Sequence, residues 1–306
     1  MNPLARPLVI VNPSAGHGRA ARVRDAVESY WRRQGVVAEF CEPASREEVR
    51  RRSAEAAAAG YSCVVALGGD GTAHDVINGM NAAPSVVGIL PAGGGNDLAR
   101  ALGLPLEPIE AAHTLLHAPT RRIDLLRLTA AAGRTCLYAG AGGAGIDAEA
   151  ARLGNTRFRR VPGVSRYVAA AIAAFHDSRP LEITLHADDA TSRRFRALLV
   201  AVANTPSYGS GVIIAPDARI DDGWMDLAIV APLDWSHVLD GLLLALRNGD
   251  IRWPEMQRLR ARKLRIETDR PAIFHGDGEV LGETPVEIEV LPRALEVLSP
   301  RSPLEV

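Results

Sequence analysis

The chain has 306 residues, 47% hydrophobic and 23% charged, which is the composition of an ordinary globular protein with enough length for two domains. Its formal net charge of −1 argues against nucleic-acid binding, which needs a basic surface. Arginine supplies almost all of the positive charge, because Lys263 is the only lysine; it lies far from any glycine turn, which excludes a P-loop nucleotidase.

The first 125 residues alternate short apolar runs with helical patterns. The apolar runs are rich in aliphatic residues and end at glycine-containing or proline-containing turns, as buried parallel strands do. This alternation predicts an α/β domain with a doubly wound parallel sheet. We expect strands at residues 8–11, 36–40, 62–67 and 86–90, and helices at 19–33, 46–59, 73–80 and 109–117, with another opening at 98–102.

Three glycine-rich loops, at residues 12–18, 68–72 and 93–97, each follow a strand of this domain. Ligands of such sheets bind beyond the carboxyl ends of the strands, so we expect the three loops to meet at one site. A glycine turn between strand and helix directs backbone N–H groups at a ligand, where phosphate oxygens can accept from them. Asp70 would repel a phosphate unless a divalent metal or a proton transfer involves it. Its place in the second loop therefore favours phosphoryl chemistry over simple anion binding.

After about residue 125 the pattern becomes rich in strands and poor in helices. Many short strands with turn signals between them predict a second, mainly antiparallel domain, either a β-sandwich or a flattened barrel. We expect strands at residues 123–128, 134–140, 181–186, 194–203, 225–230, 263–267, 272–275 and 286–291, and helices at 164–176 and 235–247.

Three motifs of the second half have competing interpretations. Residues 140–145 match the dinucleotide fingerprint G-x-G-x-x-G but lack a following βαβ unit, which favours a loop with its backbone close to another element. Residues 221–224 form either a hairpin turn or a site for a hard cation. Residues 275–279 form either a hairpin turn or the seat of an acidic general base.

The three cysteines, Cys41, Cys63 and Cys136, lack CxxC spacing, so we expect neither a disulfide framework nor a zinc site. We see no signal peptide and no apolar run near the ~18 residues that span a bilayer. The expected location is the cytoplasm, with transient contact at the inner membrane surface left open. The Ala-rich stretch 164–176 is either a lipid-facing surface or, as we favour, a buried helix.

Taken in order, these pieces resemble the catalytic-domain superfamily of diacylglycerol kinases, in its bacterial lipid-kinase branch, and are similar to sphingosine kinases. The resemblance covers almost the whole chain, and the ordered set is specific although no single piece is. The matching segments are Asn12-Pro13, residues 68–72, residues 90–100, Arg122-Ile123-Asp124, residues 216–223 and Asp277-Gly278-Glu279.

The resemblance implies transfer of the γ-phosphate of ATP to a hydroxyl of diacylglycerol or a long-chain base, at a peripheral membrane surface. It implies a nucleotide-binding domain of residues 1–125 with a returning segment at about 293–306, and a lipid-substrate domain of residues 126–292. Glu279 would be the general base, and Asp70 is the second choice for that role. Asp70 would lie against the ATP phosphates and the catalytic Mg²⁺. The nucleotide-binding residues would be Asn12, Pro13, Ser14, Cys41, Gly68, Gly69, Asp70, Gly71, Thr72, Gly93, Gly94, Gly95, Asn96 and Asp97.

The resemblance also implies a structural Mg²⁺, held by the Asp222 carboxylate and the backbone carbonyls of Arg219 and Trp224. Water would connect this ion to Asp97 and Asp124. The chain departs from the family pattern at Gly94 and Cys41, where threonine is frequent, and at Asp75, where glutamate is usual.

Two alternatives to a lipid kinase stay open at this point. One is an NAD kinase-like enzyme acting on a soluble acceptor, and the other is a non-catalytic nucleotide-binding or lipid-binding protein. The physiological lipid and the oligomeric state, a homodimer included, also stay open.

Overall fold

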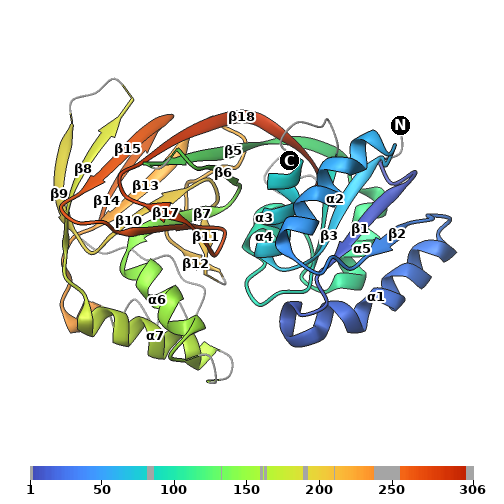
Figure 1. Cartoon of the computed structure of the whole chain (residues 1–306), viewed down its shortest axis with the longest axis horizontal. Helices are drawn as coiled ribbons and strands as arrows, with labels where there is room; N and C mark the ends of the chain where they lie inside the picture. The colour runs from blue at the N-terminus through green and yellow to red at the C-terminus, as the bar shows by residue number, and fades with distance from the viewer. Residues whose placement is uncertain are drawn as a thin grey trace. The chain divides into compact units, whose positions relative to one another are not determined.

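The chain folds into an α/β unit and a β unit, called unit 1 and unit 2 below and drawn in Figure 1. Unit 1 comprises Met1–Leu125, Leu137–Ala139 and Pro292–Val306, and unit 2 comprises Leu126–Cys136 and Gly140–Leu291. This computed structural model describes residues 3–80, 86–131, 133–158, 161, 164–188, 192–209, 211–237 and 256–300.

Unit 1 is built on a parallel sheet in the order β2-β1-β3-β4, which the end of β18 extends through a parallel pair between Val297 and Val87. Strands β1 and β3 are buried along their whole length, as expected for strands covered on both faces. The strands are β1 (Pro7–Val11), β2 (Glu39–Cys41), β3 (Cys63–Gly68), β4 (Val86–Pro91), and the ends of β5 (Thr120–Ala130) and β18 (Val286–Leu298).

Helices cover the two faces of this sheet, α1 and α5 on one and α2 and α3 on the other (Figure 1). The indole N–H of Trp31 in α1 donates to the carbonyl of Ala112 in α5 at 3.0 Å. Buried Asp75 in α3 accepts from Arg46 and Arg50 of α2. The helices are α1 (Ala15–Arg33), α2 (Arg46–Ala58), α3 (Asp70–Gly79), α4 (Asp97–Ala101) and α5 (Pro108–His117).

Unit 2 contains two antiparallel sheets, ordered β18-β15-β8-β9 and β14-β13-β10-β7-β16-β17, and a small β11-β12 hairpin. This confirms the predicted fold class, a mostly parallel α/β domain followed by a mainly antiparallel β domain. Its elements are β6 (Thr135–Tyr138, shared with unit 1), β7 (Ala141–Gly145), α6 (Ile146–Asn155), α7 (Val164–Asp177), β8 (Leu181–Ala187), β9 (Arg193–Ala197), β10 (Leu199–Ala203), β11 (Ser207–Tyr208), β12 (Val212–Ile213), β13 (Met225–Val230), β14 (Met256–Ala261), β15 (Lys263–Thr268), β16 (Ile273–Gly276) and β17 (Glu279–Glu283).

Several local predictions were wrong. Residues 140–145 were expected as a loop, but Ala141–Gly145 is strand β7, stabilised by neighbours on both sides. The expected strand 194–203 is two strands, β9 and β10, which break at Leu198 and join different sheets. Helix α3 begins at Asp70, three residues early, because Gly69 is already an extended N-cap. The predicted helix 235–247 lies outside the described residues beyond residue 237.

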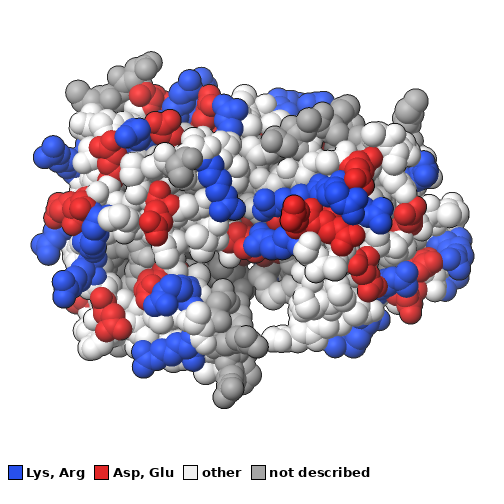
Figure 2. Space-filling model, in the orientation of Figure 1, with Lys and Arg blue, Asp and Glu red and all other residues white. Residues whose placement is uncertain are grey.

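Charged side chains of both signs are interspersed on the visible face of each unit, without a broad patch of one sign there (Figure 2). Among the described residues, none of the helices is long and apolar enough to cross a membrane.

Candidate active site

Three loops of unit 1 meet at the carboxyl edge of its parallel sheet. Val11 at the end of β1 is in register with Leu67, and Gly68 at the end of β3 is in register with Pro91 of β4. The loops that follow these strands therefore leave the sheet side by side. The glycine loops expected at residues 12–18, 68–72 and 93–97 are the ones brought together. Cys41 ends the neighbouring strand β2 opposite Ile10, at the same edge.

The loops are close enough for their backbones to touch, and glycine makes this possible. A Cβ on Gly93 would lie 2.5 Å from the Cα of Gly69, and one on Gly16 would lie 2.0 Å from the carbonyl oxygen of Ala92. By contrast, a Cβ on Gly94 meets nothing within 4 Å. Gly93 is thus required by packing between the loops, whereas Gly94 leaves open space where relatives are expected to carry threonine.

This difference predicts opposite outcomes for two adjacent substitutions. Gly93→Ala should lower the melting temperature, because forcing a methyl group into a packed site typically costs about 1–3 kcal/mol. Gly94→Ala should change the free energy of unfolding by no more than about 0.5 kcal/mol. Thermal unfolding of the two variants beside the wild type checks this, and equal melting temperatures for both would contradict the loop packing.

Polar side chains join the three loops. The Asn12 amide donates to the Thr72 hydroxyl at 3.2 Å, and its Oδ1 accepts from the N–H and hydroxyl of Ser14. Pro13 lies within this turn. In the third loop, Asn96 accepts from the N–H of Gly93 at 2.9 Å and donates back to the Gly93 carbonyl. These side chains fix loop conformations that the short glycine sequences would not fix alone.

The Asp70 carboxylate connects the second loop to the third. Its Oδ2 accepts from the N–H of Asn96 at 2.7 Å, and its Oδ1 accepts from the N–H of Leu98 at 3.3 Å. Asp70 therefore caps the N-terminus of α4, where N–H groups lack partners within the helix and a negative charge is favoured. The sequence predicted chemistry for Asp70, and the structure adds a positioning role that the sequence did not suggest.

The edge as a whole gathers the kinds of backbone group that bind anions. Gly16, His17 and Gly18 adopt left-handed φ angles of 59°, 56° and 83°, and Asn96 has φ 57°. Such conformations, together with the N-terminus of α3, direct successive N–H groups outward. Gly68, Gly69, Gly71 and Gly95 complete the second and third loops. The geometry of unit 1 suits a polyphosphate.

Two predicted metal-associated carboxylates also lie in unit 1 and are buried. Asp97 is the first residue of α4 and is 9% exposed. Asp124 in β5 is fully buried, and its Oδ1 accepts from the N–H of Arg293 in β18 at 2.6 Å. Asp124 thereby links β5 to β18 within unit 1.

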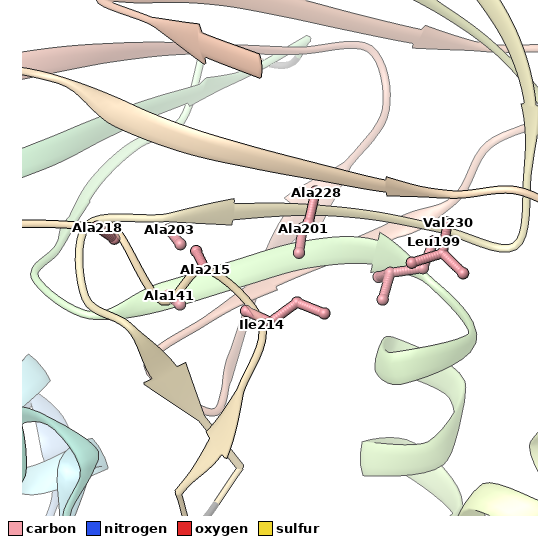
Figure 3. Close-up of a cluster of buried hydrophobic side chains, with 9 residues drawn as sticks. All are labelled: Ala141, Leu199, Ala201, Ala203, Ile214, Ala215, Ala218, Ala228 and Val230. Atoms are coloured by element: carbon pink, nitrogen blue, oxygen red, sulfur yellow. The ribbon is translucent and has the colours of Figure 1, made fainter. Parts of the chain in front are cut away.

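The loop predicted to hold a structural Mg²⁺ lies in unit 2. It follows a cluster of small buried side chains in which Ile214, Ala215 and Ala218 pack against β7, β10 and β13 (Figure 3). In the loop, Asp222 accepts from the N–H of Trp224 at 3.1 Å and forms an ion pair with Arg260 of β14. No group of three or more potential metal-binding side chains occurs in the part of the chain that the structure describes.

Arg260 bears directly on whether this loop fits a metal ion. Besides Asp222, its guanidinium contacts Asp226 at 3.4 Å and lies 5.6 Å from the Trp224 ring centroid. Burial raises the pKa of Asp226, while Arg260 opposes that rise. The Asp222 carboxylate thus already faces a positive charge that would repel a divalent cation. Arg260 therefore competes with a divalent cation for the Asp222 carboxylate, and the Mg²⁺ ligands Arg219, Asp222 and Trp224 stay a prediction.

We therefore expect chelation by EDTA to leave the melting temperature of the wild type unchanged, because no bound ion would be lost. Arg260→Gln should introduce a dependence of the melting temperature on added Mg²⁺, since Asp222 then lacks its guanidinium. Arg258→Gln on the same strand is the control. A fall of the wild-type melting temperature in EDTA that Mg²⁺ reverses would contradict this expectation and support the predicted ligands Arg219, Asp222 and Trp224.

Glu279 is positioned by a tight hairpin of unit 2. Asp277 and Gly278 both have left-handed φ angles, 52° and 80°, as a two-residue type I′ turn requires, and Glu279 starts β17 opposite Gly276. Asp277 anchors this turn on the residues at the start of β7: its carboxylate accepts from the N–H of Gly140 at 2.8 Å, and its N–H donates to the Ala141 carbonyl. The half-buried Glu279 follows immediately.

A buried, hydrogen-bonded aspartate–histidine pair beside this hairpin was missed by sequence reasoning. His275 Nε2 of β16 lies 2.7 Å from Asp147 Oδ2 of α6, and the two side chains are 8% and 9% exposed. Burial lowers the pKa of His275, but Asp147 and Asp277 outweigh it, so the pKa is raised. The two residues are 128 positions apart, and no spacing in the sequence could have paired them.

Comparisons with known proteins find two family matches that together cover most of the chain. Residues 6–128 match the family described as "Diacylglycerol kinase catalytic domain", and residues 140–299 match "YegS C-terminal NAD kinase beta sandwich-like domain". A Mycobacterium tuberculosis protein named "Diacylglycerol kinase" is 29% identical over 300 residues, which are 97% of this chain and 96% of the relative.

Two further comparisons extend over most of the chain. A Stenotrophomonas maltophilia protein named "Probable lipid kinase YegS-like" is 32% identical over 296 residues, 93% of each chain. A crystal structure of a diacylglycerol kinase from Bacillus anthracis superimposes with a TM-score of 0.73 at 19% identity, covering 99% of this chain and 98% of the other. At that identity, the structural likeness establishes the fold alone.

Proposed function

Because the chain belongs to the lipid kinase family of the diacylglycerol kinase catalytic domain and the YegS C-terminal domain, we propose that it transfers the γ-phosphate of ATP to a hydroxyl of diacylglycerol or a related lipid. The observation that carries the proposal is the meeting of three glycine loops at one sheet edge of unit 1. A protein that only bound lipid would not need these loops, whereas a non-catalytic nucleotide-binding protein would, and the acceptor assay below distinguishes that alternative.

Unit 1 is proposed to bind the phosphates of ATP, which enters as its Mg²⁺ complex. Phosphoryl transfer depends mostly on positioning and charge neutralisation. Backbone N–H groups of the glycine loops and of the start of α3 would hold the phosphate oxygens, because Asp70 already accepts from the N–H groups of Asn96 and Leu98 at the start of α4. Asn12 and Asn96 would hold the loops in shape. The Mg²⁺ that accompanies ATP would neutralise charge on the phosphates, a role that this lysine-poor chain leaves to the cation and to arginine.

In the reaction, the oxygen of the lipid hydroxyl forms a bond to the γ-phosphorus, and the bond from that phosphorus to the bridging oxygen breaks. ADP leaves with the bonding electron pair. We propose that the Glu279 carboxylate accepts the hydroxyl proton. Asp70 is the less favoured base, because its two oxygens accept from the N–H groups of Asn96 and Leu98.

The acceptor is proposed to reach unit 2 from a membrane surface. In α7, Ala170 and Ala174 are buried while Ile172 is 38% exposed, so this helix presents some apolar surface as well as a core face. Phe175 packs edge-on against Trp235, which is itself 44% exposed. Exposed indole and aliphatic groups favour the boundary between water and lipid. We infer transient peripheral binding at the inner membrane surface.

A panel of acceptors tests the proposed function. The full-length protein, MgATP and one acceptor at a time, diacylglycerol, a long-chain base or NAD, would be incubated and the products separated by thin-layer chromatography. We expect a phosphorylated lipid and no phosphorylated NAD. Phosphorylation of NAD alone would establish the NAD kinase-like alternative, and absence of product with every acceptor would favour a non-catalytic protein.

A further inference from the structure

We propose that the buried Asp147–His275 ion pair is a positioning device for Glu279, which fixes the hairpin that carries the catalytic carboxylate. This inference rests on the proposed function, because it assigns a role within the same site. All residues involved belong to unit 2, and every contact described below lies within that unit.

His275 connects the hairpin that carries Glu279 to helix α6. It lies on β16, in register with Val280 of β17 and with Gly143 of β7, and the pairing of β16 with β17 shifts register between Phe274 and His275. Because of this irregularity, the hydrogen bonds between β16 and β17 do not by themselves fix the position of β16. The contact from His275 to Asp147, at 2.7 Å, attaches the strand to the first turn of α6.

The glycines of β7 leave the space that the Asp147–His275 contact needs. A Cβ on Gly142 would lie 2.1 Å from the carbonyl oxygen of His275, and one on Gly143 would lie 2.9 Å from Asp147 Oδ2. Side chains at either position would push apart the groups that form the pair. The glycine run that matches a dinucleotide fingerprint in the sequence therefore serves a different purpose here, the close approach of β7 to β10, β16 and α6.

The contribution of the Asp147–His275 pair to the stability of the fold is expected to be small. Removing two charges from water costs about as much as their attraction returns, so buried ion pairs add little net stability, and apolar replacements are often neutral or stabilising. Stability alone thus gives little reason for a charged pair with side chains only 8% and 9% exposed. A role in positioning gives a better reason for the pair, because hydrogen bonds are directional. The contacts Asp147–His275 and Asp277–Gly140 hold the main chain on both sides of Gly276.

The experiment compares two variants with a control from the same helix. Asp147→Asn removes the charge and keeps the volume, and the double variant Asp147→Leu with His275→Met replaces the pair by apolar groups. We expect kcat for lipid phosphorylation to fall about 10- to 100-fold in both, as small displacements of catalytic groups do. The KM for ATP should stay unchanged, since the loops of unit 1 are untouched. Glu149→Gln, which breaks an exposed ion pair with Arg152, should retain wild-type kcat.

Removing one partner of a buried pair can unfold a protein, so the double variant carries the test if Asp147→Asn does not fold. A folded double variant with wild-type kcat would overturn the proposal.

Amide hydrogen exchange supplies a readout that does not need activity: exchange should accelerate in peptides covering residues 273–283 and stay unchanged in residues 86–101. Unchanged exchange in the hairpin would also overturn it. If Glu279 variants stay active while hairpin exchange accelerates, the base assignment fails and the positioning role survives.

Discussion

Glu279→Gln is expected to lower kcat for lipid phosphorylation by about 10²–10⁴-fold, the usual contribution of a general base. Glutamine keeps the shape of the side chain and the hairpin but cannot accept the hydroxyl proton. The melting temperature and ATP binding should stay at wild-type values, because the substitution leaves the Asp277 anchor and unit 1 intact. Steady-state kinetics with saturating MgATP and titrated lipid, together with a thermal scan, check each expectation.

Glu283→Gln is the matched control for this substitution. Glu283 ends the same strand, β17, and is exposed, so loss of its charge should leave kcat unchanged. A folded Glu279→Gln enzyme with near wild-type turnover would contradict the base assignment. Asp70 would then become the stronger candidate.

Asp70→Asn is expected to weaken ATP binding and to reduce lipid phosphorylation by at least about 100-fold, a loss that misplaced phosphate-binding groups can cause. The reason is geometric. Asp70 accepts from two N–H groups of the third loop, and asparagine can accept only through one atom while its amide would face an N–H donor. Loss of this cap should also lower the free energy of unfolding by about 1–2 kcal/mol.

The two effects of Asp70→Asn are measured separately, ATP affinity by calorimetry and stability by chemical denaturation. Asp25→Asn in α1 is the control, because the Asp25 side chain is 84% exposed and pairs only with a neighbouring arginine in the described structure. An Asp70→Asn protein that binds ATP and unfolds as the wild type does would contradict the role of Asp70 in joining the loops.

The sequence predicted most of unit 1 because its signals are local. Strands β1, β3 and β4 are continuous apolar runs, and each is followed by a loop that contains glycine. Their meeting at one edge follows from the rule that parallel strands end on the same side. The start of α3 could not be predicted as well, because nothing in the apolar run shows that Gly69 is extended and caps the helix.

Unit 2 was less predictable because its signals come from tertiary structure. Strand β7 is made of glycine and alanine, which have low strand propensity, and it exists because β10 and β16 pair with it. The break at Leu198 has no glycine or proline to mark it, yet it sends β9 and β10 to different sheets. Asp147–His275 and Asp222–Arg260 join residues far apart in the chain, and no local pattern reports such pairs.

Phosphoryl transfer from ATP to a lipid can be measured by following the γ-phosphate of ATP. The protein would be incubated with ATP labelled in that phosphate and with a lipid extract containing diacylglycerol, and mass analysis would identify every molecule that gains the label. We expect label in a phosphorylated lipid with the wild type and no labelled lipid with Glu279→Gln. Label confined to inorganic phosphate or to a water-soluble acceptor would contradict this expectation.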